Sequence, residues 1–231
     1  MEYEERIDLY NSEQYLEKLI KDFNKTKISN RNKQLILDFV DFLKNVRKRI
    51  APRRALKYIY TLKRCSELLG KDFDKATKKD IMNLVSQINQ MEVVKYYPKG
   101  DKKGTIAKKV EAKPWTKLNY IVMIKKLYRW MYNEKIWKID IDDYNYLFNG
   151  EDAILRVNKK EIRKRQQEKA ILGEDEIKQM LEIINNIRDK TMLSVCYEGG
   201  LRVGELLILK RKDVYFDDNG VLLSVFGKTG A

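Results

Sequence analysis

Apolar residues recur at intervals of three and four along most of the chain, and few residues interrupt the pattern. The 231 residues include only 3 prolines and 11 glycines. Apolar residues at i, i+3 and i+4 line one face of an α-helix, and proline and glycine are the residues that most often end one. The sequence therefore predicts a mainly α fold, built from long amphipathic helices.

Five helices are predicted in the first 134 residues. Ser12 can cap the first helix, Pro52 stands at a helix start, Gly70 can end that same helix, and Thr77 with Asp80 resembles a capping box. The predicted helices span 12–23, 30–49, 52–69, about 77–91 and 114–134. An insertion at about 92–113 contains a proline, two glycines and many lysines, so we expect either a mobile loop or a small hairpin there.

The remainder of the chain has a different pattern. Helices are predicted over 174–187, 188–197 and 203–209, followed by a β-hairpin whose strands, 214–216 and 221–226, flank turn residues that tolerate positive φ. Residues 139–170 change from acidic to basic and are predicted to be a linker. The expected domains are therefore 1–138, with its loop insertion at about 92–113, and 171–231.

Charge gives the first indication of function. The chain holds 48 Lys and Arg against 34 Asp and Glu, a net charge of +14, and it has no histidine. Three clusters carry most of the excess: +9 over 44–64, +6 over 95–117 and +5 over 156–169. Clustered basic charge on a folded chain favours nucleic acid as the partner, and the absence of histidine excludes Ser-His chemistry and His-ligated metal.

The two cysteines, Cys65 and Cys196, are far apart and lie in apolar helical patterns, so we expect buried free thiols in a reducing cytoplasm. No apolar stretch approaches the ~20 residues that a membrane span needs, and the acidic N-terminus is unlike a signal peptide. We expect a cytoplasmic protein without a membrane partner, in the cytoplasm of the host if a virus or plasmid encodes it.

The helix predicted over 52–69 has a basic face. A step of 100° per residue places Arg53, Lys57, Tyr60 and Arg64 together, opposite an apolar face. Such a face can lie along a DNA groove, although an ordinary solvated helix face remains the alternative. The residues expected to contact duplex DNA are Arg47, Arg49, Arg53, Arg54, Lys57, Tyr60 and Arg64, then Lys113, Lys117, Lys125, Lys126 and Arg129, and in the linker Lys159, Lys160, Arg163, Lys164 and Arg165.

The segment 197–214 reads YEGGLRVGELLILKRKDV. It resembles the first catalytic-arginine motif of the tyrosine recombinase (phage integrase) family, which is roughly T-G-L-R-x-x-E-L-x-x-L-x-x-x-D-[IV] followed by a β-hairpin with an essential lysine. Gly200, Arg202, Glu205 and Asp213 match this pattern, and Gly199 departs from it because it stands where the family usually has threonine. Residues 115–130 also resemble the last helix of the core-binding domain of that family.

The resemblance implies a helical-bundle (SAM-like) core-binding domain followed by the first, α+β part of a catalytic domain. It also implies site-specific DNA recombination, including viral genome integration, by a DNA clamp that works as a dimer or tetramer without metal or cofactor. By resemblance, Arg202 stabilises the charge on the phosphate oxygens, Glu205 orients Arg202, and Lys228 protonates the leaving 5′-oxygen.

None of the 14 tyrosines stands in the sequence context of the family's nucleophile, so we expect these 231 residues alone to be inactive in DNA cleavage. Two explanations stay open: a fragment of a longer integrase, or a naturally truncated DNA-binding protein that occupies or regulates recombination sites. A helical RNA-binding or structural module is a third alternative.

Overall fold

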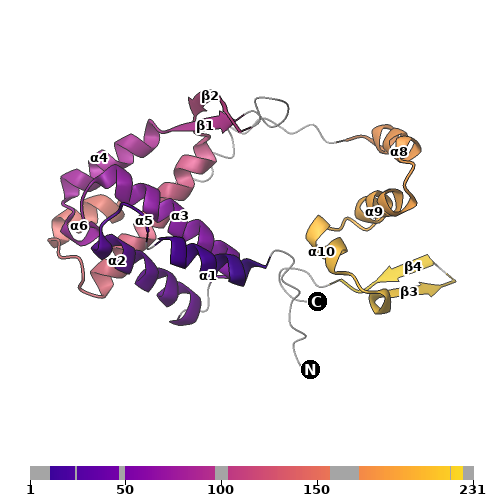
Figure 1. Ribbon diagram of the computed structural model, residues 1–231, viewed down its shortest axis with the longest axis horizontal. Helices are drawn as coiled ribbons and strands as arrows, with labels where there is room; N and C mark the ends of the chain where they lie inside the picture. The colour runs from indigo at the N-terminus through magenta and orange to yellow at the C-terminus, as the bar shows by residue number, and fades with distance from the viewer. Residues whose placement is uncertain are drawn as a thin grey trace. The chain divides into compact units, whose positions relative to one another are not determined.

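A computed structural model of the chain describes residues 11–23, 25–46, 50–96, 104–156, 172–218 and 220–225 (Figure 1). These residues form two units, which we call the helical unit (residues 11–156) and the second unit (residues 172–225). Each unit is described by itself. The fold is mainly α, as predicted, and each unit contains one small two-stranded antiparallel sheet.

The helical unit contains most of the helices. Its elements are α1 (Ser12–Phe23), α2 (Asn30–Asp41), a π-helical turn (Phe42–Val46), α3 (Pro52–Leu69), a 3-10 turn (Phe73–Lys75), α4 (Lys78–Asn89), β1 (Glu92–Tyr96), β2 (Ile106–Glu111), α5 (Pro114–Asn133) and α6 (Ile141–Phe148).

Local sequence signals explain where several of these helices begin and end. Pro52 occupies the first turn of α3, and Gly70 ends it at a φ of +70°, a conformation that glycine adopts without steric cost. Thr77 caps α4 through the backbone N–H of Asp80, whose carboxylate accepts the N–H of Thr77 in return. These parts of the sequence prediction are confirmed.

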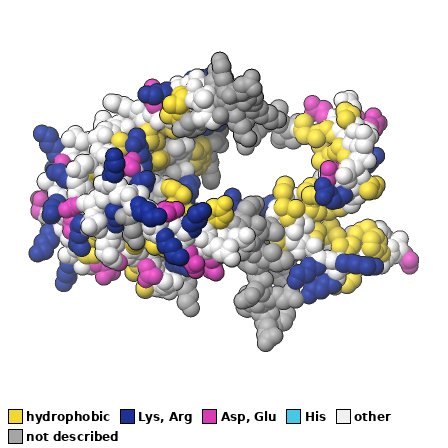
Figure 2. All heavy atoms as spheres, in the orientation of Figure 1, with side chains coloured by type: hydrophobic (Ala, Val, Ile, Leu, Met, Phe, Trp, Pro, Cys, Tyr) yellow, Lys and Arg dark blue, Asp and Glu magenta, His cyan; other side chains and the backbone are white. Residues whose placement is uncertain are grey.

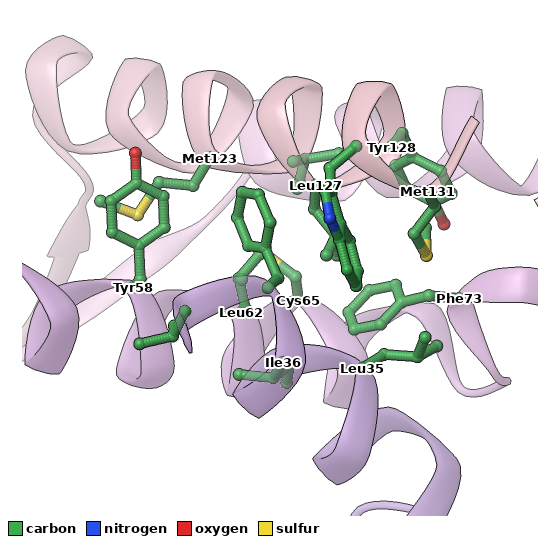
Figure 3. Close-up of a cluster of buried hydrophobic side chains, with 14 of the residues drawn as sticks. Leu35, Ile36, Tyr58, Leu62, Cys65, Phe73, Met123, Leu127, Tyr128 and Met131 are labelled. Atoms are coloured by element: carbon green, nitrogen blue, oxygen red, sulfur yellow. The ribbon is translucent and has the colours of Figure 1, made fainter. Parts of the chain in front are cut away.

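The core of the helical unit lies between α2, α3 and α5 (Figure 3). Ile36 from α2, Leu62 and Cys65 from α3, and Leu127 and Tyr128 from α5 are all fully buried. The buried positions on these helices follow the apolar periodicity of the sequence. Burial of this face, rather than helix propensity, provides most of the stabilisation in a bundle of this kind.

Two sequence predictions about the helical unit need correction. The helix predicted over 30–49 is regular only to Asp41 and continues as the π-helical turn, and residues 47–49 lie outside the described part of the chain. The linker predicted to begin at residue 139 is also wrong at its start. Residues 141–148 form α6, and Leu147, Phe148 and Leu155 belong to the core.

Aromatic stacking explains why this acidic segment folds onto the unit. Asp140 caps α6 by accepting the backbone N–H groups of Asp142 and Asp143, at 3.0 and 2.9 Å. The ring of Tyr144 then stacks on Tyr132 of α5 and on Phe148, with ring centroids 4.0 and 4.6 Å apart. The acidic residues therefore belong to a capped helix start, where they complement the helix dipole.

The second unit is smaller. Its elements are α8 (Glu174–Ile183), α9 (Ile187–Glu198), α10 (Val203–Ile208), a 3-10 turn (Arg211–Asp213), β3 (Val214–Asp217) and β4 (Gly220–Leu223). The hairpin pairs Val214 with Leu223 and Asp217 with Gly220, as the turn sequence predicted. The sequence placed the boundary between the first two helices at residues 187 and 188, whereas α8 ends at Ile183 and α9 begins at Ile187. Residues 184–186 form the connection, and the side chain of Asn186 caps α9 by accepting the N–H of Arg188.

Apolar side chains cover much of the surface of the second unit (Figure 2). Among its described residues, Ile177 is the one buried hydrophobic side chain. Phe216 and Leu222 on the hairpin are 78% and 64% exposed. The described part of this unit thus differs from the helical unit, which has a continuous core.

Candidate functional site

Arg202 stands at the start of α10, just after a sharp turn. At the end of helix α9, the N–H of Gly199 donates a hydrogen bond to the carbonyl of Val195, at 3.1 Å. Gly200 follows with a φ of +59°. A side chain would be strained at Gly200, since L-residues rarely adopt that backbone conformation. A β-carbon at Gly199 would lie 2.9 Å from the carbonyl oxygen of Val195, so glycine fits there without any shift.

Glu205 holds Arg202 at two points. One oxygen of its carboxylate accepts the backbone N–H of Arg202 at 2.9 Å, and the other accepts the guanidinium Nη1 at 2.6 Å. These contacts lower the pKa of Glu205, the backbone hydrogen bond most and the side-chain bond next, so the carboxylate stays ionised. Residues three apart on a helix face the same side, and the sequence therefore predicted this pair.

The two members of the pair differ in accessibility. The side chain of Arg202 is 75% exposed, whereas that of Glu205 is 14% exposed. One of the five guanidinium N–H groups is engaged by Glu205, and the exposed remainder of the group can meet the oxygens of a phosphate. Glu205 is therefore the covered member of the pair that fixes the guanidinium, and Arg202 is the exposed member.

The basic face of α3 forms as predicted. Arg53, Lys57, Tyr60 and Arg64 are exposed, with Tyr60 at 59%, and Arg54 beside them is exposed as well. Ala55, Ile59 and Leu62 on the opposite side are fully buried. Arg64 also makes an ion pair with Glu67 on the same helix, at 3.1 Å. This pair is exposed, so it adds little to stability and leaves the guanidinium able to bind elsewhere.

The basic residues near α5 divide into different roles. Lys113 is exposed, as expected of a residue that meets DNA. Lys117 is the main correction, because its side chain is only 13% exposed and its Nζ binds the carboxylate of Glu111 and, at 2.5 Å, the carbonyl of Asn89. The structure gives Lys117 a place in the fold in which its charge is neutralised.

The other three basic residues of α5 lie at contacts with neighbouring elements. Lys125 donates to the carbonyl of Phe148 at 3.4 Å, and burial, followed by the charge of Arg129, lowers the pKa of Lys125. Arg129 lies over the ring of Phe148, 5.7 Å from its centroid. Lys126 donates to the hydroxyl of Tyr58 at 3.1 Å. Lys126 and Arg129 remain exposed and keep a charge for a ligand, whereas Lys125 is partly covered.

Several predicted site residues lie outside the described residues. They are Arg47, Arg49, Lys159, Lys160, Arg163, Lys164, Arg165 and Lys228. Neither a cluster of three metal-ligating side chains nor a helix long and apolar enough to cross a membrane occurs in the described part of the chain. Both cysteines are free: Cys65 is buried, as predicted, and Cys196 is only partly buried.

Sequence reasoning did not single out Lys108 and Lys109, which lie exposed on β2. The segment 92–113 allowed either a loop or a hairpin, and the structure contains the hairpin. Residues 106–111 read IAKKVE and do not alternate between apolar and polar residues, so the sequence carried no clear signal that would have placed these two lysines on a strand.

Comparisons with known proteins agree with the geometry around Arg202. Residues 170–231 match the sequence model described as the phage integrase family. Transposase A from transposon Tn554 of Staphylococcus aureus is 41% identical over 70 residues, which are 30% of this chain and 18% of that protein. Tyrosine recombinase XerA of Pyrococcus horikoshii is 42% identical over 52 residues, 22% of this chain and 18% of that protein.

The matched segments span less than a fifth of the length of each of these relatives. No solved structure matches the chain. The family model nevertheless covers α8 to β4, and thus the Arg202–Glu205 pair. The part of this chain that the comparisons assign to the phage integrase family, the family of the tyrosine recombinases, is therefore residues 170–231.

Proposed function

We propose that this chain is part of a tyrosine recombinase that binds duplex DNA and takes part in site-specific strand exchange. The arrangement of Arg202 and Glu205 is the observation that carries the proposal. A planar guanidinium that Glu205 holds through Nη1, and that is otherwise largely exposed, suits the non-bridging oxygens of a phosphodiester, which gather negative charge as the bond is attacked. Electrostatic stabilisation of this kind needs a charge that is positioned before the reaction.

In this proposal the helical unit is a core-binding domain whose α3 face lies against DNA, and together with the second unit it forms a clamp on the duplex. Arg53, Lys57 and Arg64 bind phosphates, and Tyr60 lies among them on the same face. We assign Lys228 the role of general acid toward the leaving 5′-oxygen. The protein acts in the cytoplasm, as a dimer or tetramer on paired sites.

DNA binding is the first test. Each protein cation that meets a phosphate releases counterions, so the logarithm of the affinity falls with the logarithm of salt by about 0.9 per contact. Changing Arg53, Lys57 and Arg64 together to Gln should reduce the slope by about 2.7. Over a fourfold change in salt, that slope corresponds to about a 40-fold difference in affinity.

The matched control changes three exposed lysines of the helical unit that lie outside the proposed surface, namely Lys75, Lys135 and Lys138, to Gln. Both variants lose the same charge, so an effect of net charge alone would weaken binding equally. Affinity is measured by fluorescence anisotropy on a labelled duplex at several salt concentrations. A slope that is unaffected by the α3 variant would contradict the proposed interface.

Arg202 is tested in the same assay and by its effect on specificity for the reacting phosphate. Arg202→Gln should lower the salt slope by about 0.9, whereas Glu205→Gln should leave the charge of Arg202 in place but release its guanidinium. A duplex with one methylphosphonate at the scissile position lacks the charge that Arg202 meets. The affinity difference between the native and the modified duplex should disappear in Arg202→Gln and shrink in Glu205→Gln.

We further propose that none of the 14 tyrosines in these 231 residues is the nucleophile. Tyr58 and Tyr128 are both fully buried in the core of the helical unit, so neither can reach a phosphate. A nicked suicide duplex traps a covalent phosphotyrosine if one forms. The expected result is no DNA adduct on a denaturing gel, and an adduct mapped to any of these tyrosines would refute this assignment.

A further inference from the structure

The hairpin β1–β2 projects from the helical unit between α4 and α5 (Figure 1). Its ladder continues into the domain, because the N–H of Ala112 donates to the carbonyl of Met91 at 2.9 Å, and both of these side chains are buried. Lys117 of α5 ties the base of the ribbon to the bundle through Glu111 and the carbonyl of Asn89. The ribbon is therefore anchored firmly at its base.

The register of the ribbon sets two like-charged pairs directly opposite each other. Glu92 faces Glu111 at the base, and Lys95 faces Lys108 further out. Like charges at directly opposed positions destabilise a hairpin. Lys117 compensates the acidic pair, and the same contact lowers the pKa of Glu111.

The basic part of the ribbon is not compensated in this way. No carboxylate among the described residues lies within ion-pair distance of Lys108 or Lys109, and both side chains are exposed. A ribbon whose acidic pair is neutralised, while Lys108 and Lys109 stay exposed without a carboxylate from the described residues, fits a surface that meets an anion supplied from outside.

The ribbon also starts beside the basic face of α3. Tyr60 and Arg64 of α3, Val93 and Val94 of β1 and Tyr120 of α5 line one shallow hollow on the surface. A ligand that runs along α3 past Arg64 therefore reaches β1 next. The strand residues 106–111 extend the surface by about 20 Å, at about 3.3 Å per residue.

We propose that the β1–β2 hairpin is a phosphate-binding arm that contacts the same duplex as the basic face of α3, with Lys108 and Lys109 as its phosphate ligands. The arm binds the DNA backbone next to the segment that α3 covers, and so lengthens the footprint of the helical unit. A two-stranded ribbon is narrow enough to follow a DNA groove. This inference rests on the proposed function, since it requires α3 to face DNA.

The test compares two double variants of equal charge. Lys108→Gln with Lys109→Gln removes the arm ligands, and Lys135→Gln with Lys138→Gln removes two exposed lysines outside the proposed surface. The arm variant should lower the salt slope of duplex binding by about 1.8, and the control should leave it unchanged. Hydroxyl-radical footprinting should show loss of protection at one edge of the footprint, with the centre retained.

If Lys108 and Lys109 stabilised the fold, their replacement would lower the thermal unfolding midpoint. The proposed role in DNA binding predicts no such fall. Because Lys108 faces another lysine in the register, its replacement by Gln should leave the thermal unfolding midpoint unchanged or raise it while DNA binding falls. A lower midpoint together with weaker binding would overturn the proposal, since it would make the lysines part of the fold.

The two proposals fail in different ways. Normal binding by the arm variant together with a reduced slope in the α3 triple variant would overturn the arm and leave the DNA interface standing. Normal binding by both variants would overturn the interface and the arm together.

Discussion

The amide of Asn32 joins three segments of the helical unit inside its core, and its removal gives the sharpest test of how that unit is held together. Asn32 is 2% exposed. Its Nδ2 donates to Ser66 Oγ at 2.7 Å and to the carbonyl of Lys71 at 2.9 Å, and its Oδ1 accepts the N–H of Phe73 at 2.8 Å. This side chain fixes α2 against the end of α3 and the 3-10 turn that follows.

The expected cost of Asn32→Ala follows from these contacts. Three hydrogen bonds of about 1 kcal/mol each are lost, and the buried N–H of Phe73 is left without its acceptor, which brings the total to about 3–4 kcal/mol. In a domain of this size each kcal/mol lowers the unfolding midpoint by roughly 2–4 °C, so the midpoint should fall by about 10 °C.

Tryptophan fluorescence is a suitable probe, because all three tryptophans, Trp115, Trp130 and Trp137, lie in the helical unit. Urea titration of the wild type and the variant gives the difference in free energy of unfolding. Gln34→Ala is the matched control, since Gln34 is an exposed amide on the same helix, with one hydrogen bond to Asp38 at 2.7 Å. A loss below about 1 kcal/mol in Asn32→Ala, or an equal loss in both variants, would refute the argument.

Three more outcomes follow from single groups. The pKa of Asp80 is lowered to about 2, first by the hydrogen bond from Lys71. Its contribution to stability is therefore complete above about pH 4 and is lost as the pH falls toward 2, so urea unfolding at pH 2–5 should show a weaker acid dependence in Asp80→Asn. A thiol reagent should modify Cys196 in the native protein and Cys65 only after denaturation, since burial raises the pKa of the Cys65 thiol and blocks access. Gly200→Ala should cost about 1 kcal/mol because of its positive φ, and hydrogen exchange of the amides on either side should speed up.

The parts of the fold that depend on local signals could be read from the sequence. The ends of α3 and the start of α4 follow from Pro52, Gly70 and the capping box at Thr77 and Asp80, all of which act within a few residues. The Arg202–Glu205 pair is equally local, because a spacing of three on a helix brings the two side chains together. Its accessibility was not predictable, since exposure depends on the packing of the whole unit.

Elements that depend on contacts across the chain could not be read in the same way. Residues 141–148 have the acidic composition of a linker, and their folding as α6 depends on contacts such as the stacking of Tyr144 on Tyr132 of the preceding helix. The same applies to residues 92–111, because a hairpin and a mobile loop share their turn residues. Only the pairing of the two strands distinguishes a hairpin from a loop, and this pairing depends on the register between residues that are separated in the sequence.

Lys108 and Lys117 show why basic residues counted along a sequence overestimate the charge that is available to an anionic ligand. Both belong to the cluster over 95–117, and their charges are identical in any sum. In the structure, Lys117 is 13% exposed and neutralised by Glu111, whereas Lys108 is exposed and faces another lysine in the register. Replacement of Lys117 by Gln should therefore loosen the base of the hairpin and lower its stability, but its direct effect on the salt dependence of binding should be small. Replacement of Lys108 by Gln should leave stability intact and reduce the salt dependence, so the contacts of each lysine, rather than their number, determine what each contributes to the proposed DNA binding.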